Sequence, residues 1–279
     1  MRRTDLLVIL IPLAIVFYFI YVMMGWNFIA SFTDWDSMII TFGFVGFEHY
    51  AAMFGSPIFI TSFWNTVLLF LGIPLCILFG LIIATLLDQK MRGASVFRSI
   101  YLLPFALSFV VTATMWKWMY NPTEGVLNSI LPGQFPWTTS SDPAILVSSL
   151  ILVLVWQFTG YATMILLAGM KAVPESRIEA AKIDGASGFR LYRKIIYPNL
   201  KAPLVTSFVV LLMFFIRAAF DLVNTLTGGG PGTSSYTLPL LIYKEAFVNN
   251  QFAYGAAIAV VLLAIAMVIV IPYLYKTYR

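Results

Sequence analysis

Two oppositely charged residues, Arg217 and Asp221, lie inside an apolar stretch of this sequence. An ionisable side chain in the hydrocarbon of a membrane costs about 2.5 kcal/mol or more, so such residues have a functional or a pairing reason. Four residues apart on a helix, the two share a face and can form an ion pair. An unpaired guanidinium would instead bind a carboxylate, sulfate or phosphate group of a solute. Both interpretations are open, and the spacing favours the pair together with an uncharged solute.

Aromatic and polar side chains occur together in a second apolar stretch. Trp156 and Tyr161 offer ring faces, while Gln157, Thr159 and Thr163 offer hydrogen-bonding groups. A sugar requires this combination, because its CH faces stack on rings and its hydroxyls need polar partners. The same polar side chains can instead join neighbouring helices in a membrane. Both roles are open for these residues.

The longest polar interval of the chain begins at Pro174, a residue typical of a helix start. Asp184 and Gly185 predict a turn, because glycine adopts the positive φ that ends a helix. After the turn, Ser187 predicts the N-cap of a second helix, and Pro198 predicts its end. The interval therefore favours two short helices joined by a turn.

The second of these helices is predicted to be amphipathic. Phe189, Tyr192 and Ile196 fall on one face, and the basic residues fall on another. Helices this short are marginal in water, so the apolar face needs a partner, and the basic face could lie against phospholipid headgroups. An ordinary polar loop between two membrane spans is the alternative. Residues 171–203, which include this interval, are called the polar segment below.

The composition places the rest of the chain in a lipid bilayer. Of its 279 residues, 61% are hydrophobic and only 10% are charged, whereas soluble domains carry about a quarter charged residues. The mean hydropathy is +0.91. Backbone groups in lipid must be satisfied within each span, and the apolar runs are too long for barrel strands. The sequence therefore predicts an all-α, polytopic membrane protein.

Six transmembrane helices account for the apolar runs. They are expected at residues 6–28, 58–87, 99–119, 144–170, 204–226 and 252–275. The first run is too long for a signal peptide and indicates a retained helix, and Pro104 predicts a kink in the third. Residues 1–57 then hold the first helix and an external segment, and residues 58–279 hold a five-helix core with the polar segment.

Positive residues are distributed unequally between the loops. Of the 17 Lys and Arg residues, 14 lie in the N-terminus, the loop after the second span, the polar segment or the C-terminal tail. The positive-inside rule therefore predicts that both termini and the polar segment face the cytoplasm. Because topology explains the net charge of +5, we predict no nucleic-acid partner.

Several kinds of site are disfavoured by residue counts. Cys76 is the only cysteine and His49 the only histidine, which excludes an intramolecular disulfide and a two-histidine metal site. Cys76 is predicted to be a buried structural thiol. The run from Gly228 to Pro231 lacks the Lys-Ser/Thr ending of a P-loop and favours a flexible turn at the external mouth. We predict no catalytic residue, no metal and no cofactor in this chain.

The polar segment also resembles a known motif, the EAA loop of the inner-membrane permeases of binding-protein-dependent ABC importers. In that family the loop is a coupling helix that sits in a cleft of the cytoplasmic ATPase. The residues to which the resemblance and the apolar face assign ATPase coupling are Glu179, Ala180, Ala181, Asp184, Gly185, Ala186, Phe189, Ile195 and Pro198. Tyr192 and Tyr197 stand where the family usually has Phe and Leu.

Landmarks of the carbohydrate-uptake branch, with its maltose-type and glycerol-phosphate-type permeases, occur along nearly the whole chain. They include residues 47–50, 65–66, 92–93, 97–98, 103–104, 118, 156, 160, 226–231, 242–243 and 246–247. The resemblance implies the transmembrane domain of a type I ABC importer for a sugar or related polar solute. It also implies four kinds of partner. The first is a second permease, which is usually a different chain, and the second is a pair of ATPase subunits that bind ATP and Mg. The other two are an extracytoplasmic solute-binding protein and the lipid bilayer.

The resemblance further implies a substrate path. In maltose permeases the sugar is held by the fourth and fifth spans, and two matching positions, Ile216 and Ala219, are asparagines there. Either the solute differs or the partner subunit supplies more of the pocket. The predicted path residues are Trp156, Thr159, Gly160, Tyr161, Thr163, Phe215, Ile216, Arg217, Ala219 and Asp221.

A secondary transporter or channel is the main alternative class. Such a carrier would show ionisable relays at the membrane midplane or paired broken helices, and only Arg217 and Asp221 qualify. An intramembrane enzyme is a third class, and no catalytic constellation supports it. The identity and the charge of the solute are not determined by the sequence.

Overall fold

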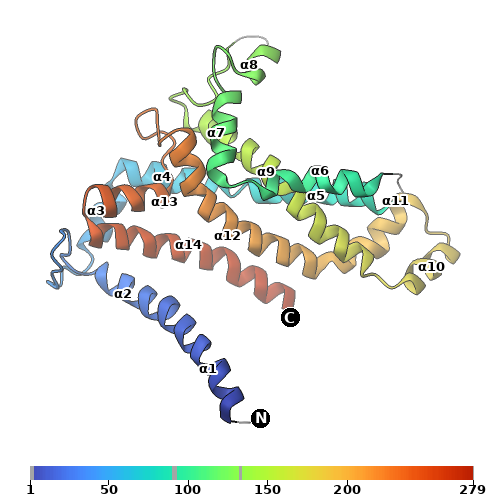
Figure 1. Cartoon of the computed structure of the whole chain (residues 1–279), viewed down its shortest axis with the longest axis horizontal. Coiled ribbons are helices and arrows are strands. Elements are labelled where there is room, and N and C mark those ends of the chain that lie inside the picture. The colour runs from blue at the N-terminus through green and yellow to red at the C-terminus, as the bar shows by residue number, and fades with distance from the viewer. Residues whose placement is uncertain (1–2, 90–92, 132–133, 279) are drawn as a thin grey trace. The chain divides into compact units, whose positions relative to one another are not determined.

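The computed structural model describes residues 3–89, 93–131 and 134–278 (Figure 1). Four of the basic residues used to predict orientation lie outside these ranges: Arg2, Lys90, Arg92 and Arg279. The described backbone is helical, and its only β-type pairing is an antiparallel bridge between Thr33 and Phe44. The predicted all-α class is confirmed.

Five described helices are long and apolar enough to cross a membrane, and a bent helix pair provides a sixth span. The five helices are Leu10–Ala30, Pro57–Asp88, Pro143–Lys171, Gly188–Leu226 and Phe252–Pro272. Each overlaps one of the predicted runs. With the bent pair counted as one span, the described residues give the six spans that the sequence predicts.

The sequence predicts a single helix for the third span, but the structure divides this span into two helices. Helices α6 (Ala94–Ala106) and α7 (Phe109–Met119) are bent by 97°. The break lies at Leu107 and Ser108, whose backbones are extended. Ser108 Oγ accepts a hydrogen bond from Val111 N at 3.3 Å, so it caps α7 and lets the helix restart. The break thus lies three residues after Pro104, where the sequence predicts a kink, and Pro104 itself lies inside α6.

The chain forms two compact units. The first comprises residues 1–60 and 238–265. Its helical elements are α1 (Arg3–Phe17), a π-turn (Tyr18–Val22), α2 (Met23–Ala30), α3 (Glu48–Gly55), α13 (Leu238–Tyr243), a π-turn (Lys244–Val248) and the start of α14 (Phe252–Tyr278). Ala253 N donates to Trp35 O at 2.9 Å, and the Trp35 ring stacks on Phe252. These contacts join the N-terminal and the C-terminal segment of the unit. The predicted division of the chain at residue 57 concerns topology and stays a prediction.

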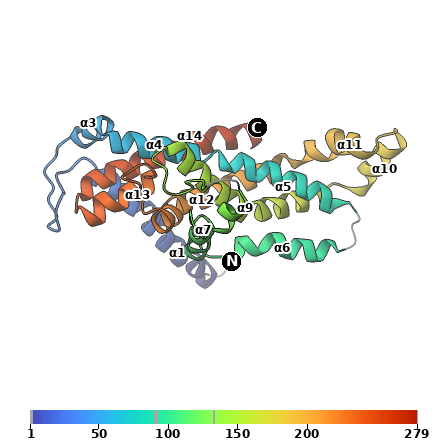
Figure 2. The ribbon, with the colours of Figure 1, turned by 90° about the horizontal axis from the view of Figure 1, so that it is seen from above.

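The second unit comprises residues 61–237 and 266–279. Besides the bent pair it contains most of α4 (Pro57–Leu69), then α5 (Gly72–Asp88), α8 (Val126–Ile130), α9 (Pro143–Lys171) and α12 (Lys201–Leu226). Helices α5 and α9 pack along their lengths (Figure 2). Gly80 permits this, since a Cβ there would lie 2.8 Å from the Ala162 Cβ. Cys76 is fully buried, as predicted, with Sγ 3.9 Å from Leu154 O.

The glycine run lies in a loop of turns, as predicted, and its flexibility stays a prediction. The buried Asn65 side chain donates both of its amide protons to this loop, to Ser234 O and Tyr236 O at 2.8 Å each. Thr237 Oγ1 donates to Ala219 O at 2.6 Å. Because these groups come from α4 and α12, the loop is fixed to two spans.

Candidate functional site

A cavity of about 360 Å³ is bounded by residues of α6, α7, α9 and α12. Its volume is in the range of small-molecule sites. The residues that line it are Phe105, Leu107, Ser108, Phe109, Val110, Gln157, Phe158, Phe214, Arg217 and Asp221. Four phenylalanine rings thus surround a few hydrogen-bonding groups, which is the combination that sugar binding requires.

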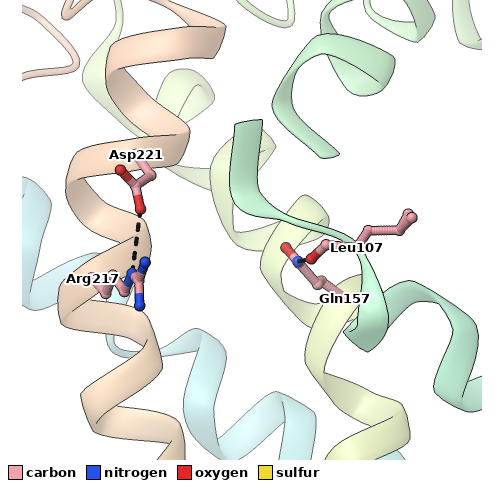
Figure 3. Close-up of polar contacts among 4 residues, drawn as sticks. All are labelled: Leu107, Gln157, Arg217 and Asp221. Atoms are coloured by element: carbon pink, nitrogen blue, oxygen red, sulfur yellow. Dashed lines mark hydrogen bonds and ion pairs between the residues drawn. The ribbon is translucent and has the colours of Figure 1, made fainter. Parts of the chain in front are cut away.

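Two of the lining residues are the predicted pair of charges, whose side chains lie along α12 in Figure 3. Arg217 Nε lies 3.6 Å from Asp221 Oδ2, one turn away on α12, and the two side chains are 75% and 27% exposed. The Arg217 guanidinium carbon lies 6.0 Å from the centre of the Phe109 ring. The ion pair is therefore formed and is neutral as a unit. Since both side chains line the cavity, the pair can still offer donors and an acceptor to a solute.

The break between α6 and α7 forms one wall of the cavity. The buried Gln157 side chain donates from Nε2 to Leu107 O at 3.1 Å (Figure 3). A carbonyl at a helix end has no partner in its own helix, and in a membrane the protein must supply one. Gln157 Oε1 is buried without a hydrogen-bond partner among the described residues.

Non-helical backbone at membrane depth is tolerated where it lines a cavity, and discontinuous helices are typical of transport sites. This wall is not among the features predicted from the sequence. Ser108, a capping residue directly before an apolar run, is the signal that could have located it.

Three predicted path residues line a different cavity, of about 370 Å³. Trp156, Thr159 and Gly160 border it together with apolar residues of α5 and α6. The hydroxyl of Thr159 donates to Val155 O at 2.6 Å, and that of Thr163 donates to Thr159 O at 2.8 Å. Both hydroxyl protons are thus donated within α9 itself, and neither goes to a neighbouring helix.

The remaining predicted path residues lie in or near the core of the second unit. Phe215 and Ala219 are fully buried, and Ile216 is half-buried. Tyr161 is also half-buried, and its ring centre lies 5.1 Å from that of Phe105, which lines the first cavity. Of the ten predicted residues, the structure brings Arg217 and Asp221 to the first cavity and Tyr161 beside it. Their role as a path stays a prediction.

Gly160 makes a packing contact that a substitution will test. A Cβ at this position would collide with the backbone carbonyl of Tyr101, so α6 and α9 would have to separate. We expect Gly160→Ala to lower the melting temperature of the detergent-purified permease by several degrees, because overpacking costs about 1–3 kcal/mol. Gly25→Ala is the matched control, since nothing lies within 4 Å of a Cβ there. Equal melting temperatures for the two variants would contradict this packing role.

The polar segment folds as the predicted pair of helices joined by a turn (Figure 1). Helix α10 (Glu175–Ile183) ends at Asp184, and Gly185 has the predicted positive φ, +81°. Helix α11 (Gly188–Leu191) follows Ser187, which occupies the N-cap position without a side-chain cap bond. The two-helix prediction is therefore confirmed. Ser187 is the residue at the N-cap, as predicted, but its side chain makes no capping hydrogen bond.

The prediction that Pro198 ends the second helix is wrong. Helix α11 continues as a π-turn (Tyr192–Ile196) and a 3₁₀ turn (Tyr197–Leu200), and the chain then runs directly into α12. Proline has no N–H to bond back to the preceding turn. The wider π-turn before Pro198 and the tighter 3₁₀ turn around it accommodate that loss. The hydrogen-bond spacing changes there, and the chain stays helical.

One face of the polar segment is buried and the other is open. Ala181, Leu191 and Ile196 pack into a cluster with residues near the ends of α5 and α9. The predicted apolar face is therefore only partly right, because Ile196 is buried but Phe189 is 69% exposed. Ile183, at the end of α10, is 87% exposed. Glu179, Ala180, Asp184 and Gly185 are also exposed. The segment thus presents an open surface with apolar and acidic side chains.

The fold and the site together define a multi-pass, helical membrane protein of the transport class. Residues 76–279 match the family described as the inner membrane component of binding-protein-dependent transport systems, and the chain belongs to this family. The matched range contains α9, the polar segment and α12. The family resemblance noted from the motifs is thereby confirmed.

Relatives match over nearly the full chain. The chain is 47% identical over 291 residues to a probable ABC transporter permease of Pyrococcus horikoshii, covering 100% of this chain and 99% of the relative. It is 38% identical to a xylose/arabinose import permease of Haloferax volcanii, covering 96% of this chain and 86% of that protein.

A solved bacterial transporter has the same fold. It is an alginate ABC transporter in complex with a periplasmic protein that holds an alginate pentasaccharide. It superposes with a TM-score of 0.82 at 21% identity, over 96% of this chain and 92% of that one. At this identity the likeness concerns the fold alone.

Proposed function

We propose that this chain is one permease subunit of an ATP-driven importer that moves an uncharged sugar or a related polar solute into the cytoplasm. The observation that carries the proposal is the cavity at the broken span, where phenylalanine rings surround the Arg217–Asp221 pair. A neutral pair suits hydroxyl groups better than it suits a net charge, because each charge already has its counter-ion. The xylose/arabinose relative supports a sugar as the solute.

The polar segment is proposed as the site through which the partner ATPase drives this chain. It faces the cytoplasm together with both termini and docks its open surface, with Ile183 and Phe189 as apolar anchors, on a partner ATPase. The two side chains are 87% and 69% exposed and would supply apolar area to such a contact. ATP and Mg are bound by two ATPase subunits and not by this chain.

The assembly is proposed to contain two permeases. One polar segment can meet only one ATPase, whereas a nucleotide sandwich needs two ATPases, so a second permease must carry the other contact. We propose a different chain as this second permease. An extracytoplasmic binding protein delivers the solute, which the description of the family as binding-protein-dependent supports.

Uptake into vesicles tests the proposal. The permease is reconstituted with its partner permease, ATPases and binding protein, and uptake is measured for labelled D-xylose, D-glucose and maltose, with glycerol 3-phosphate as the charged probe. We expect uptake of a neutral sugar only when ATP is on the ATPase side, and no effect of collapsing the proton gradient. A functional complex with this chain as its only permease would contradict the two-permease assembly.

A secondary transporter is the second candidate, because the broken span between α6 and α7 is a feature of such carriers. Only one broken pair occurs among the described helices, whereas carriers of this class carry two in corresponding positions. Uptake that proceeds without ATP and stops when an ion gradient is collapsed would favour this candidate over the importer.

A further inference from the structure

Two tyrosine hydroxyls join the polar segment to the end of α5. Tyr192 Oη donates to Asp88 Oδ2 at 3.0 Å, and Tyr197 Oη lies 3.1 Å from Thr85 Oγ1. Thr85 already donates its only hydroxyl proton to Leu81 O at 2.7 Å. The Tyr197 hydroxyl is therefore the donor, and both bonds run from the polar segment to α5.

The π-turn places the two tyrosines together. The backbone N–H of Tyr197 donates to Tyr192 O, five residues back, and the two ring centres lie 6.0 Å apart. On a regular α-helix, residues five apart point about 140° away from each other. Their acceptors, Thr85 and Asp88, are three apart on α5 and share a face. The unusual turn thus matches two donors to two acceptors, and such turns are frequent at functional sites.

The apolar contacts in this region do not fix one alignment. Leu191 and Ile196 pack with Ala84 and Leu87, but apolar burial is non-directional and would tolerate a small slide or rotation. Hydrogen bonds weaken steeply when their geometry changes, and a bond to a carboxylate is among the stronger ones. The two tyrosines therefore set the register between the polar segment and α5.

We propose that Tyr192 and Tyr197 form a two-point latch that makes the polar segment and α5 move as one body. The inference rests on the proposed function, since the displacement would come from the ATPase. Helix α5 packs along α9, which carries Gln157 and Phe158 of the cavity. A displacement of the polar segment is thus passed to the cavity wall without loss at the first junction. The tyrosines are positioning residues and touch no solute.

Distances between two nitroxide labels test the latch. Gln89→Cys and Ser187→Cys place the labels at exposed positions on the end of α5 and in the polar segment, while the native Cys76 is buried. The full complex is measured without nucleotide and with ATP bound to hydrolysis-deficient ATPases. We expect one narrow distance that is the same in both states. With Tyr192→Phe and Tyr197→Phe combined, we expect a broader distribution without nucleotide and a shift when ATP binds.

Acceptor and control variants separate the latch from a merely structural role. Asp88→Leu should reproduce the effect of Tyr192→Phe, and combining the two should add nothing further, whereas Asp88→Asn keeps an acceptor and should retain a narrow distance. Tyr21→Phe removes an exposed hydroxyl from the first span and should change nothing.

Three results would overturn the latch: a wild-type distance that shifts with ATP, a Phe double variant with the wild-type distribution, or a lower melting temperature without any change in distance. Absence of ATP-driven uptake in the wild-type vesicles would contradict the proposed function instead. Because the broadening is expected without nucleotide, the latch is judged independently of uptake.

Discussion

Gly185→Val is expected to reduce ATP-driven uptake about thirty-fold while the permease still folds and assembles, since a strained backbone position of this kind costs about 2 kcal/mol. Gly185 joins α10 to α11 with φ +81°, and a Cβ there would meet nothing within 4 Å. The Cβ of the new side chain therefore meets no atom that would disturb the fold. The strain falls on the turn itself, where a β-branched residue is strongly disfavoured at positive φ. Relieving that strain rotates α11 relative to α10 and misplaces the surface that we propose for the ATPase.

The matched control for this prediction is Gly185→Asn, because asparagine tolerates the left-handed region. It should keep most of the uptake. Assembly is followed by copurification of the ATPases, and coupling by the ratio of sugar taken up to ATP hydrolysed. Equal uptake by the Val and Asn variants would show that the conformation of this turn has no part in coupling.

Loss of one member of the Arg217–Asp221 pair is expected to have the second large effect. Arg217→Met leaves the Asp221 carboxylate without its counter-ion, and Asp221→Leu does the same to the guanidinium. A lone charge in a transmembrane helix costs about 2.5–3.5 kcal/mol at the membrane centre, and less where it borders a water-accessible cavity. Each single variant should therefore reduce assembled complex several-fold and uptake by more than ten-fold.

The double variant separates pairing from solute contact. Arg217→Met combined with Asp221→Leu removes both charges, so assembly should recover, whereas uptake should stay low because the cavity loses its two charged groups. Arg217→Lys keeps the charge without the planar donor group and is the conservative control. A normally assembled Arg217→Met complex that selectively lost uptake of glycerol 3-phosphate would show that Arg217 recognises an anion.

Much of the fold could be predicted because its determinants are local. An apolar run about 20 residues long has few options in lipid other than a helix, so the span positions match the predicted ones closely. Glycine at a helix end is equally local, and the turn at Gly185 is as expected. Pro198 is different, because a π-turn and a 3₁₀ turn accommodate it and the helix does not end there, as proline within a regular α-helix would predict.

The candidate site could be predicted only in part. The i, i+4 spacing of Arg217 and Asp221 is set by one helix, and the pair is formed as expected. The wall opposite them depends on Gln157 of α9 meeting Leu107 at a helix break, two groups 50 residues apart in sequence. Neither a glutamine nor a leucine predicts such a contact by its type alone. The predicted path residues therefore lie partly at the first cavity, partly at the second and partly in the core.

The sequence by itself determined that this protein is a helical, multi-pass membrane permease with a two-helix polar segment, because length, hydropathy and motif are properties of contiguous residues. Only the tertiary structure decided that the third span is broken, which residues surround the cavity, and that Tyr192 and Tyr197 meet α5. These features depend on directional contacts between elements distant in sequence. Hydrogen bonds and close packing select one such arrangement from many that the same local patterns allow.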